Sequence, residues 1–213
     1  KEIIVVIFRE SNFFHKVKRI FIFLFLFITI LSPISSFADK IKSSQSLVTD
    51  IYRELSIIAE LNLTESEQKK KLVFLFDKYV DVKIIARAVL GGAWRQASPS
   101  QKDKFISAFK EYASNKYGKQ FSEFKGTKLK IQKSKDTGTK AGVLVSSYLT
   151  VPGRDSIKVI WQVSDGSGFV KLIDIKVEGI SMLSTERQEI RSKLKKASGS
   201  INKLIIDMQR EES

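Results

Sequence analysis

The sequence contains no cysteine, and its single histidine, His15, lies near the amino terminus. Without cysteine, the domain must be held together by packing rather than by disulfides. Beyond residue 38 there is no histidine either, which excludes a Ser-His-Asp triad, a cysteine nucleophile and any zinc site that needs His or Cys. We therefore expect no catalytic residue, no metal site and no cofactor.

The amino-terminal region has the pattern of a secretory signal. A basic cluster at residues 15–19 precedes the hydrophobic run Ile20–Leu31, and the small residues Ser36 and Ala38 predict cleavage after Ala38. We assign residues 16–38 to a signal peptide and assign no function to residues 1–15. An uncleaved membrane anchor is the alternative, but the run is shorter than the roughly 20 residues that span a bilayer as a helix.

Residues 39–213 are long enough for one domain with its own core. They carry 32 basic and 21 acidic residues, a net charge of about +11. This charge suits an anionic membrane surface, an acidic protein or nucleic acid, and export disfavours nucleic acid. Because the charges are spread along the chain, they are also typical of an ordinary solvated surface.

The first half of the domain reads as helices. An apolar stripe from Leu47 to Ile58 ends near Asn62, and Thr64 with Glu67 predicts a capping box for the next helix. The run Leu72–Phe76 is apolar on every side, which predicts a deeply buried helix.

Two further helix starts can be read from the sequence. Asp81 predicts the N-cap of a helix that stops at the glycine pair of residues 91–92, and Ser98, Pro99 and Gln101 predict the start of a long helix. Aromatic residues line one side of this helix, with Gly118 marking a bend: Phe105, Phe109, Tyr112, Tyr117, Phe121 and Phe124.

From Thr127 the period changes from helix to strand. Alternating apolar residues predict four strands, near residues 128–132, 143–151, 157–163 and 169–177, joined by short turns. Ser184 predicts the start of another helix, and Ile201, Leu204, Ile205 and Met208 mark the last one. The fold class is α+β, with a twisted antiparallel four-stranded sheet packed against several helices.

The apolar faces can form a filled core or line a cavity, and periodicity does not distinguish the two. A cavity is favoured by the six large aromatic residues on one side of the helix that starts at Pro99, which face aliphatic strands. Such a slot suits flexible apolar chains.

Two ordered motifs make the sequence resemble a known family. The stretch from Tyr79 to Gln101, continued by Phe105, Phe109 and Tyr112, is similar to the MlaC family, and the stretch Val177–Thr185 is a second match in the expected order. The members are periplasmic phospholipid-binding proteins of the Mla lipid-asymmetry pathway, also described as toluene-tolerance auxiliary components of an ABC transporter.

This resemblance implies a pocket between sheet and helices that takes acyl chains while the headgroup stays outside. It also implies a non-enzymatic carrier in the periplasm, which shuttles phospholipid between an outer-membrane lipoprotein complex and the substrate-binding subunit of an inner-membrane ABC transporter. A hopanoid-type lipid is an open alternative, and we expect a monomer that binds no nucleic acid.

The expected lipid-binding residues come from both layers of the fold. The helix-side candidates are Ile84, Ala88, Val89, Trp94, Phe109, Tyr112, Tyr117 and Phe121. The sheet-side candidates are Val143, Val145, Val159, Trp161, Ile173, Ile175 and Met182. Arg87 and Arg95, which flank the glycine turn, are candidates for the pocket mouth or a docking surface.

Two other functions are compatible with the same sequence. The first is an exported basic module that binds an acidic protein or polysaccharide, for which we expect a filled core and salt-sensitive binding. The second is a histidine-free enzyme that uses Asp174 or Glu178, for which we expect a carboxylate with a shifted pKa in a cleft.

Overall fold

The computed structural model describes residues 34–61, 63–118, 120–139 and 141–210, without the side chains of residues 34–37, 121 and 122. Residues 16–33 of the expected signal peptide lie outside these ranges, and residues 34–38 belong to the first helix that is described. The chain divides between Asp39 and Lys40, and the unit Lys40–Ser213 holds the fold.

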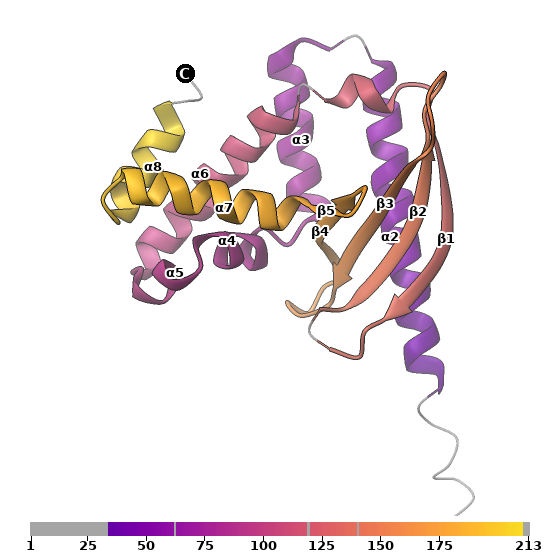
Figure 1. The fold of residues 1–213 in the computed structure, drawn as a ribbon, viewed down its shortest axis with the longest axis horizontal. Helices are drawn as coiled ribbons and strands as arrows, with labels where there is room; N and C mark the ends of the chain where they lie inside the picture. Colours follow the sequence, from indigo (N-terminus) through magenta and orange to yellow (C-terminus); the bar gives the residue numbers. More distant parts are fainter. Residues whose placement is uncertain (1–33, 62, 119, 140, 211–213) are drawn as a thin grey trace, which may run out of the picture. The chain divides into compact units, whose positions relative to one another are not determined.

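Helices precede and follow a single sheet along the chain (Figure 1). Before the sheet come α2 (Ile34–Glu60), α3 (Glu65–Tyr79), α4 (Val82–Leu90), α5 (Gly92–Gln96), α6 (Pro99–Gly118) and the 3-10 helix η1 (Phe121–Phe124). The strands are β1 (Lys128–Asp136), β2 (Val143–Thr150), β3 (Ile157–Ser164), β4 (Lys171–Val177) and β5 (Ile180–Ser181). The chain continues with α7 (Met182–Lys196) and α8 (Ile201–Arg210).

Three predicted helix starts are confirmed by their capping hydrogen bonds. Thr64 and Glu67 form the reciprocal capping box of α3. At α6, the backbone N–H of Gln101 donates to Ser98 Oγ at 3.2 Å, and the N–H of Ser98 donates to Gln101 Oε1 at 2.9 Å. Asp81 Oδ1 accepts the amide of the third residue of α4 at 2.9 Å. Local polar chemistry thus fixes where these helices begin.

The sheet is an antiparallel meander in the order β1-β2-β3-β4-β5. Four of its strands correspond to the four predicted ones, and the two-residue strand β5 is an addition. The α+β class is therefore confirmed. Cross-strand partners share one face, so Val145, Trp161 and Ile175 form one row across β2, β3 and β4.

One group of buried residues, the helical core, lies entirely among helices. It combines residues of α4, α5 and α6 with residues of α7 and α8. Its members are Ala86, Val89, Leu90, Trp94, Ala97, Phe105, Ala108, Phe109, Tyr112, Ala113, Ile190, Ala197, Ile201, Leu204, Ile205 and Met208.

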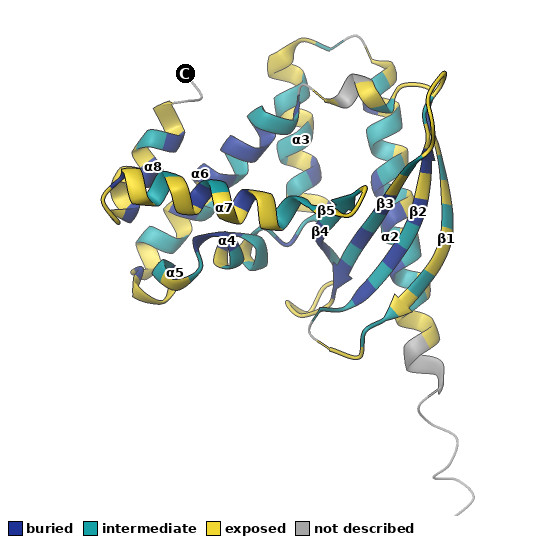
Figure 2. Cartoon of the chain, in the orientation of Figure 1, coloured by how far each residue is buried: buried dark blue, intermediate teal, exposed yellow. Residues whose placement is uncertain are grey.

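A second group, the sheet core, lies between one face of the sheet and helices α2 and α3. Figure 2 shows its buried residues as dark blue bands that recur along β2 and β3. Its members are Val48, Ile51, Ile58, Leu75, Tyr79, Val143, Val145, Leu149, Val159, Trp161, Val163 and Leu172. The molecule therefore has two apolar cores, where the sequence predicted one apolar interior.

The predicted aromatic helix is shorter than expected, because α6 ends at Gly118. A Cβ on Gly118 would lie 3.9 Å from the backbone N of Lys69 in α3, so the chain passes close to that helix here. Tyr117 packs against the helical core and Phe124 packs against the sheet core. Residues of one periodic stripe thus pack against two separate cores.

Deep burial of the run Leu72–Phe76 was a wrong prediction, because Phe74 is 55% exposed. Leu75 belongs to the sheet core and Phe76 packs against the helical core, so these two cores cover only two sides of α3. The ring of Phe74 faces the third side, where Lys78 Nζ lies 5.7 Å from its centroid.

The start of α7 also differs from the prediction. Ser181 is the N-cap, and its Oγ accepts the amide N–H of Ser184 at 3.0 Å. Met182 is therefore the first residue of a helix rather than part of the sheet side, and Ser184 lies inside the helix. Two serines three residues apart offer the same capping chemistry, and pairing of β5 with β4 favours the earlier one.

Two glycines in the turn between β1 and β2 differ in their surroundings. Replacing each with alanine tests how closely the turn approaches β3. Gly142 has φ +73° and its added Cβ would lie 2.0 Å from Val163 O, whereas Gly138 has φ +64° and open space around it. Gly138→Ala should cost about 1–2 kcal/mol from backbone strain alone. Gly142→Ala should cost at least about 2 kcal/mol more, because the methyl group also meets the neighbouring strand. Urea unfolding measures both, and equal losses would contradict the close approach.

Candidate functional site

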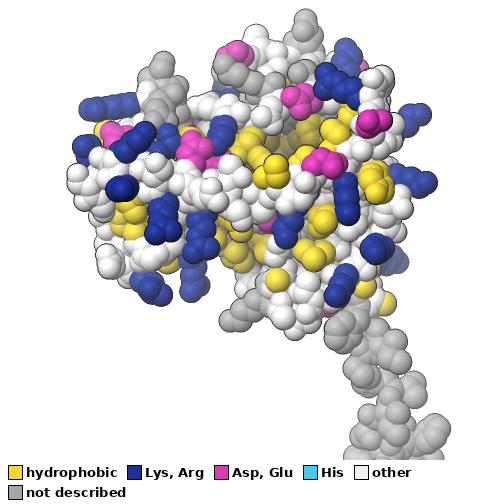
Figure 3. Space-filling model, viewed as in Figure 1, with side chains coloured by type: hydrophobic (Ala, Val, Ile, Leu, Met, Phe, Trp, Pro, Cys, Tyr) yellow, Lys and Arg dark blue, Asp and Glu magenta, His cyan; other side chains and the backbone are white. Residues whose placement is uncertain are grey.

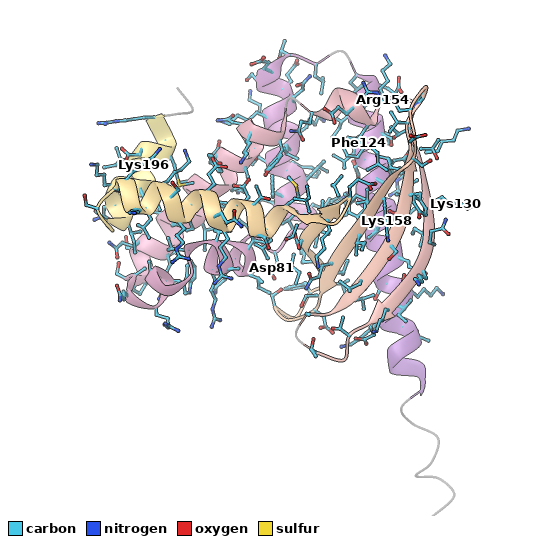
Figure 4. The ribbon with its side chains drawn as sticks, in the orientation of Figure 1. Asp81, Phe124, Lys130, Arg154, Lys158 and Lys196 are labelled. Carbon is cyan, nitrogen blue, oxygen red and sulfur yellow. The ribbon has the colours of Figure 1, made fainter. Side chains whose placement is uncertain are left out.

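A recess edged by hydrophobic side chains opens between α3, η1 and the sheet (Figure 3). In Figure 4, Phe124 lies in the space between η1 and the strands. Half-buried hydrophobic residues from the surrounding elements pack against the sheet core: Leu55, Leu72, Phe124, Ile157 and Ile175. Half-burial leaves part of each of these side chains available for contact with another apolar group.

The strand register explains why the wall of this recess is apolar. Ile157 pairs with Leu149, and Ile175 pairs with Trp161, so the half-buried residues continue the rows of the buried ones. Trp161 Nε1 donates to Ser147 Oγ at 2.9 Å, and Ser147 Oγ donates to the carbonyl oxygen of Val159 at 3.2 Å. The polar atoms of this sheet face are thus satisfied within the sheet.

The structure places the sheet-side candidates at different depths. Val143, Val145, Val159 and Trp161 are buried in the sheet core. Ile173 is buried where the pairing of β3 with β4 is irregular, and Ile175 is half-buried at the edge of the core. Ile175 is therefore the strand candidate that is only half-buried.

The helix-side candidates lie in other surroundings. Val89, Trp94, Phe109 and Tyr112 are buried in the helical core, and Tyr117 packs against it. Ile84 and Ala88 on α4 are half-buried. The side chain of Phe121 lies outside the described residues. The structure does not join the helix-side and sheet-side sets in one cluster, and lipid contact by the helix-side set stays a prediction.

Four of the half-buried residues that pack against the sheet core, on the elements around the recess, were not among the candidates. Ile157 belongs to the predicted alternation of its strand, and Phe124 belongs to the predicted aromatic stripe. Leu55 and Leu72 come from helix stripes that the sequence assigned to ordinary core. Their spacing in the sequence predicts the helix or strand face on which they lie. Their half-burial can be seen only in the structure.

The two arginines that flank the glycine turn, Arg87 and Arg95, are both exposed. The turn itself lies against α7, whose Arg187 and Arg191 line a depression with Gly91. Proximity along the sequence thus pointed to Arg87 and Arg95, whereas the fold brings Arg187 and Arg191 to the same turn.

A polar cluster joins α6 to α7 beside the helical core. Lys116 Nζ donates to Glu186 Oε1 at 2.7 Å and to Glu189 Oε2 at 2.5 Å. Tyr112 donates to Glu189 Oε1 at 2.5 Å, and Tyr117 donates to Glu186. Glu186 is 4% exposed, so Lys116 and the phenol of Tyr117 stabilise its carboxylate inside the protein.

The pKa shifts in this cluster follow from the same contacts. Burial, together with the hydrogen bond to Glu189, raises the pKa of Tyr112, and burial with the hydrogen bond to Glu186 raises the pKa of Tyr117. Burial alone would raise the pKa of Glu189, but hydrogen bonds from Lys116 and Tyr112 outweigh it and the pKa is lowered. The phenols therefore stay neutral donors, and Glu189 stays ionised beside the lysine.

The two carboxylates proposed for a histidine-free enzyme have structural partners. Asp174 accepts from Ser181 Oγ at 2.7 Å and from the amide of Leu183 at 2.9 Å, which fixes the start of α7 to β4. Glu178 has φ 48° and accepts the amide of Lys158. Both contacts join neighbouring segments of the backbone.

Two further features are absent from the described part of the chain. It contains no group of three His, Cys, Asp or Glu side chains that could hold a metal ion. Among its helices, none is both long and apolar enough to cross a bilayer.

The fold and the recess together define a class of protein, an α+β domain with an apolar space beside its sheet. The chain belongs to the MlaC family, because the family model described as "MlaC protein" matches residues 49–210.

Two relatives have informative descriptions. The chain is 26% identical over 108 residues to the "Intermembrane phospholipid transport system binding protein MlaC" of Haemophilus influenzae, a match that covers 49% of this chain and 50% of that protein. The chain thus spans about half the length of this curated relative. A phospholipid-binding protein of Ralstonia solanacearum, solved in complex with a phospholipid, has the same fold with a TM-score of 0.66 at 16% identity; the match covers 79% of this chain and 96% of that one.

The buried cluster around Lys116 has a measurable pH dependence. Lys116→Met should destabilise the protein by about 3–5 kcal/mol at neutral pH, because it leaves Glu186 buried without a counter-charge. The lowered pKa of Glu189 stabilises the wild type above the unfolded pKa, and this contribution is lost as the pH falls through the folded pKa. The stability difference between variant and wild type should therefore narrow on acidification.

Urea unfolding at neutral pH and near pH 4 measures this difference. Lys196→Met, at the exposed end of α7, is the control and should change stability by less than about 0.5 kcal/mol at both pH values. A constant penalty for Lys116→Met across the pH range would contradict the charge pairing.

Proposed function

We propose that this protein is an exported lipid carrier that holds the acyl chains of a phospholipid in the recess beside its sheet. It moves lipid through the periplasm, between an outer-membrane lipoprotein complex and an inner-membrane ABC transporter, and so maintains outer-membrane lipid asymmetry. The sequence pattern of a leader ending at Ala38 supports export.

The observation that carries this proposal is the recess itself. Hydrophobic side chains edge it in Figure 3, and half-buried hydrophobic side chains of α2, α3, η1 and two strands pack against the adjoining sheet core. Membership of the MlaC family supports the same reading, as do the phospholipid bound to the Ralstonia protein and the transport system that the Haemophilus relative is named for.

Transfer energies set what such a carrier has to do. Two acyl chains contain about 30 methylene groups, and exposing them to water costs roughly 25 kcal/mol at about 0.8 kcal/mol each. A carrier must therefore cover nearly all of the hydrocarbon during transit. It needs apolar surface rather than a reactive group, and the hydrated headgroup can remain outside.

The recess residues test the proposal because they are not needed to close a core. Ile175→Glu should abolish the phospholipid that co-purifies with the protein, since a carboxylate in the recess would have to be desolvated beside acyl chains. The protein should still fold, because Ile175 is only half-buried. Native mass spectrometry without detergent measures the bound lipid, and circular dichroism measures folding.

Two matched variants complete the experiment. Tyr148→Glu changes the opposite face of the sheet, where the side chain is 41% exposed, and should keep its lipid. Val145→Glu places the same charge in the sheet core, at 0% exposure, and should prevent folding. If the unchanged protein carries no lipid after gentle purification, the carrier proposal is wrong.

A further inference from the structure

Helix α7 carries its two kinds of charge on different sides. Glu186 and Glu189 face α6, where Lys116 forms an ion pair with each of them. Arg187, Arg191 and Lys195 follow at intervals of four residues, so they form a separate exposed stripe. The two glutamates are thus paired within the protein, and the basic stripe is exposed to solvent.

The basic stripe borders a groove with an apolar floor. A depression of about 360 Å³ lies between the glycine turn and α7, where Arg187 and Arg191 stand beside Leu90, Ile190 and Leu194. A neighbouring depression of about 680 Å³ runs on along α7 to Gly199 and shares Arg191 and Leu194 with the first. We call the two together the α7 groove.

The arginines of this groove have no internal counter-charge. Within the ranges that the structure describes, no carboxylate forms an ion pair with Arg187 or Arg191. Figure 3 shows Lys and Arg side chains gathered over α7 and the helices next to it, with hydrophobic atoms exposed between them. Unpaired guanidinium groups above an apolar floor are complementary to a ligand that is both acidic and hydrophobic.

The glycine turn keeps the groove open. Gly91 has φ 60° and ψ −124°, a conformation that favours glycine, and caps the end of α4. An added Cβ on Gly92 would meet nothing within 4 Å. A side chain at this position would therefore project into free space at the groove rather than into the protein.

We propose that the α7 groove is a docking site for an acidic segment of a partner protein, which inserts an apolar side chain between the glycine turn and α7 while its carboxylates pair with Arg187 and Arg191. None of the groove residues belongs to the set that borders the lipid recess. The two sites can therefore be tested independently, and docking does not require that the recess binds lipid.

A protein segment fits this surface better than a membrane does. A bilayer presents a broad layer of headgroups to a basic face, and such a contact needs charge but no depth. The depression beside the glycine turn is concave, whereas the one that runs on to Gly199 is shallow, and the half-buried Leu194 lines both. Binding sites for projecting side chains have this form, with a central apolar anchor and a polar rim.

The test uses the exported domain and a fluorescein-labelled helical peptide made of the repeat Leu-Glu-Ala-Leu-Glu-Glu. We expect binding that weakens with added salt, and that weakens at least about tenfold in the double variant Arg187→Glu and Arg191→Glu. The double variant Lys196→Glu and Lys203→Glu changes the net charge equally outside the groove, and should bind within about twofold of the unchanged protein.

A second variant separates depth from charge. Gly92→Phe leaves the net charge unchanged and places a ring at the edge of the first depression, so it should also weaken peptide binding. The peptide with Gln in place of every Glu should not bind. Native mass spectrometry should find the same amount of bound lipid in the groove variants as in the unchanged protein, since the recess is untouched.

Several outcomes would overturn the proposal. The first is no peptide binding by the unchanged protein, and the second is equal weakening in the groove variant and its charge-matched control. A third is unchanged binding in Gly92→Phe, which would indicate a purely electrostatic surface. The fourth comes from vesicles of phosphatidylglycerol and phosphatidylcholine: if the arginine reversals weaken vesicle binding but not peptide binding, the face contacts membranes instead.

Discussion

The two-residue period of the strands is the constraint on which the rest of this fold depends. It places Val145, Trp161 and Ile175 in one row on a single face of the sheet, and that face must be covered by other parts of the chain. Helices α2 and α3 cover the middle of the face and leave its edge half-buried. The recess is therefore a consequence of incomplete cover on an otherwise ordinary apolar sheet.

The absence of disulfides makes the second core important. Helices α4 to α8 pack on one another without help from the sheet face, and the buried ionic cluster around Lys116 joins two of them. Breaking one partner of such a cluster costs more than the cluster contributes, because the remaining charge is stranded. The cluster therefore specifies how α7 is rotated about its axis, and that rotation decides which of its charges reach solvent.

Local signals were sufficient for most of the fold. The capping residues Thr64, Asp81 and Ser98 need only neighbouring backbone amides, and the strands need only alternation, so both can be read from sequence. The partner of an apolar stripe is a tertiary property. The stripe through Tyr117 and Phe124 therefore looked like one wall of one cavity, whereas the end of α6 at Gly118 divides it between two cores.

The site was less predictable than the fold for a related reason. Periodicity reports which side of an element is apolar, but the difference between a core residue and a lining residue is a difference in coverage by other elements. Val159 and Ile175 lie on the same face of neighbouring strands, yet only Val159 is fully buried. Half-buried lining residues such as Leu55 carry the same sequence signal as the buried Ile51 one turn away.

A carrier that binds hydrocarbon has little means of recognising where it is. The hydrophobic effect is not directional, and it holds a lipid equally well whichever membrane lies nearby. Recognition of a destination has to come from directional groups, such as guanidinium groups that pair with carboxylates in a defined geometry. The proposed separation of a lipid recess from a docking groove meets this requirement, because guanidinium groups placed at the recess would have to be desolvated each time an acyl chain entered. Their position on the outer side of α7 avoids that cost, while the cluster around Lys116 holds the helix in the one rotation that exposes them.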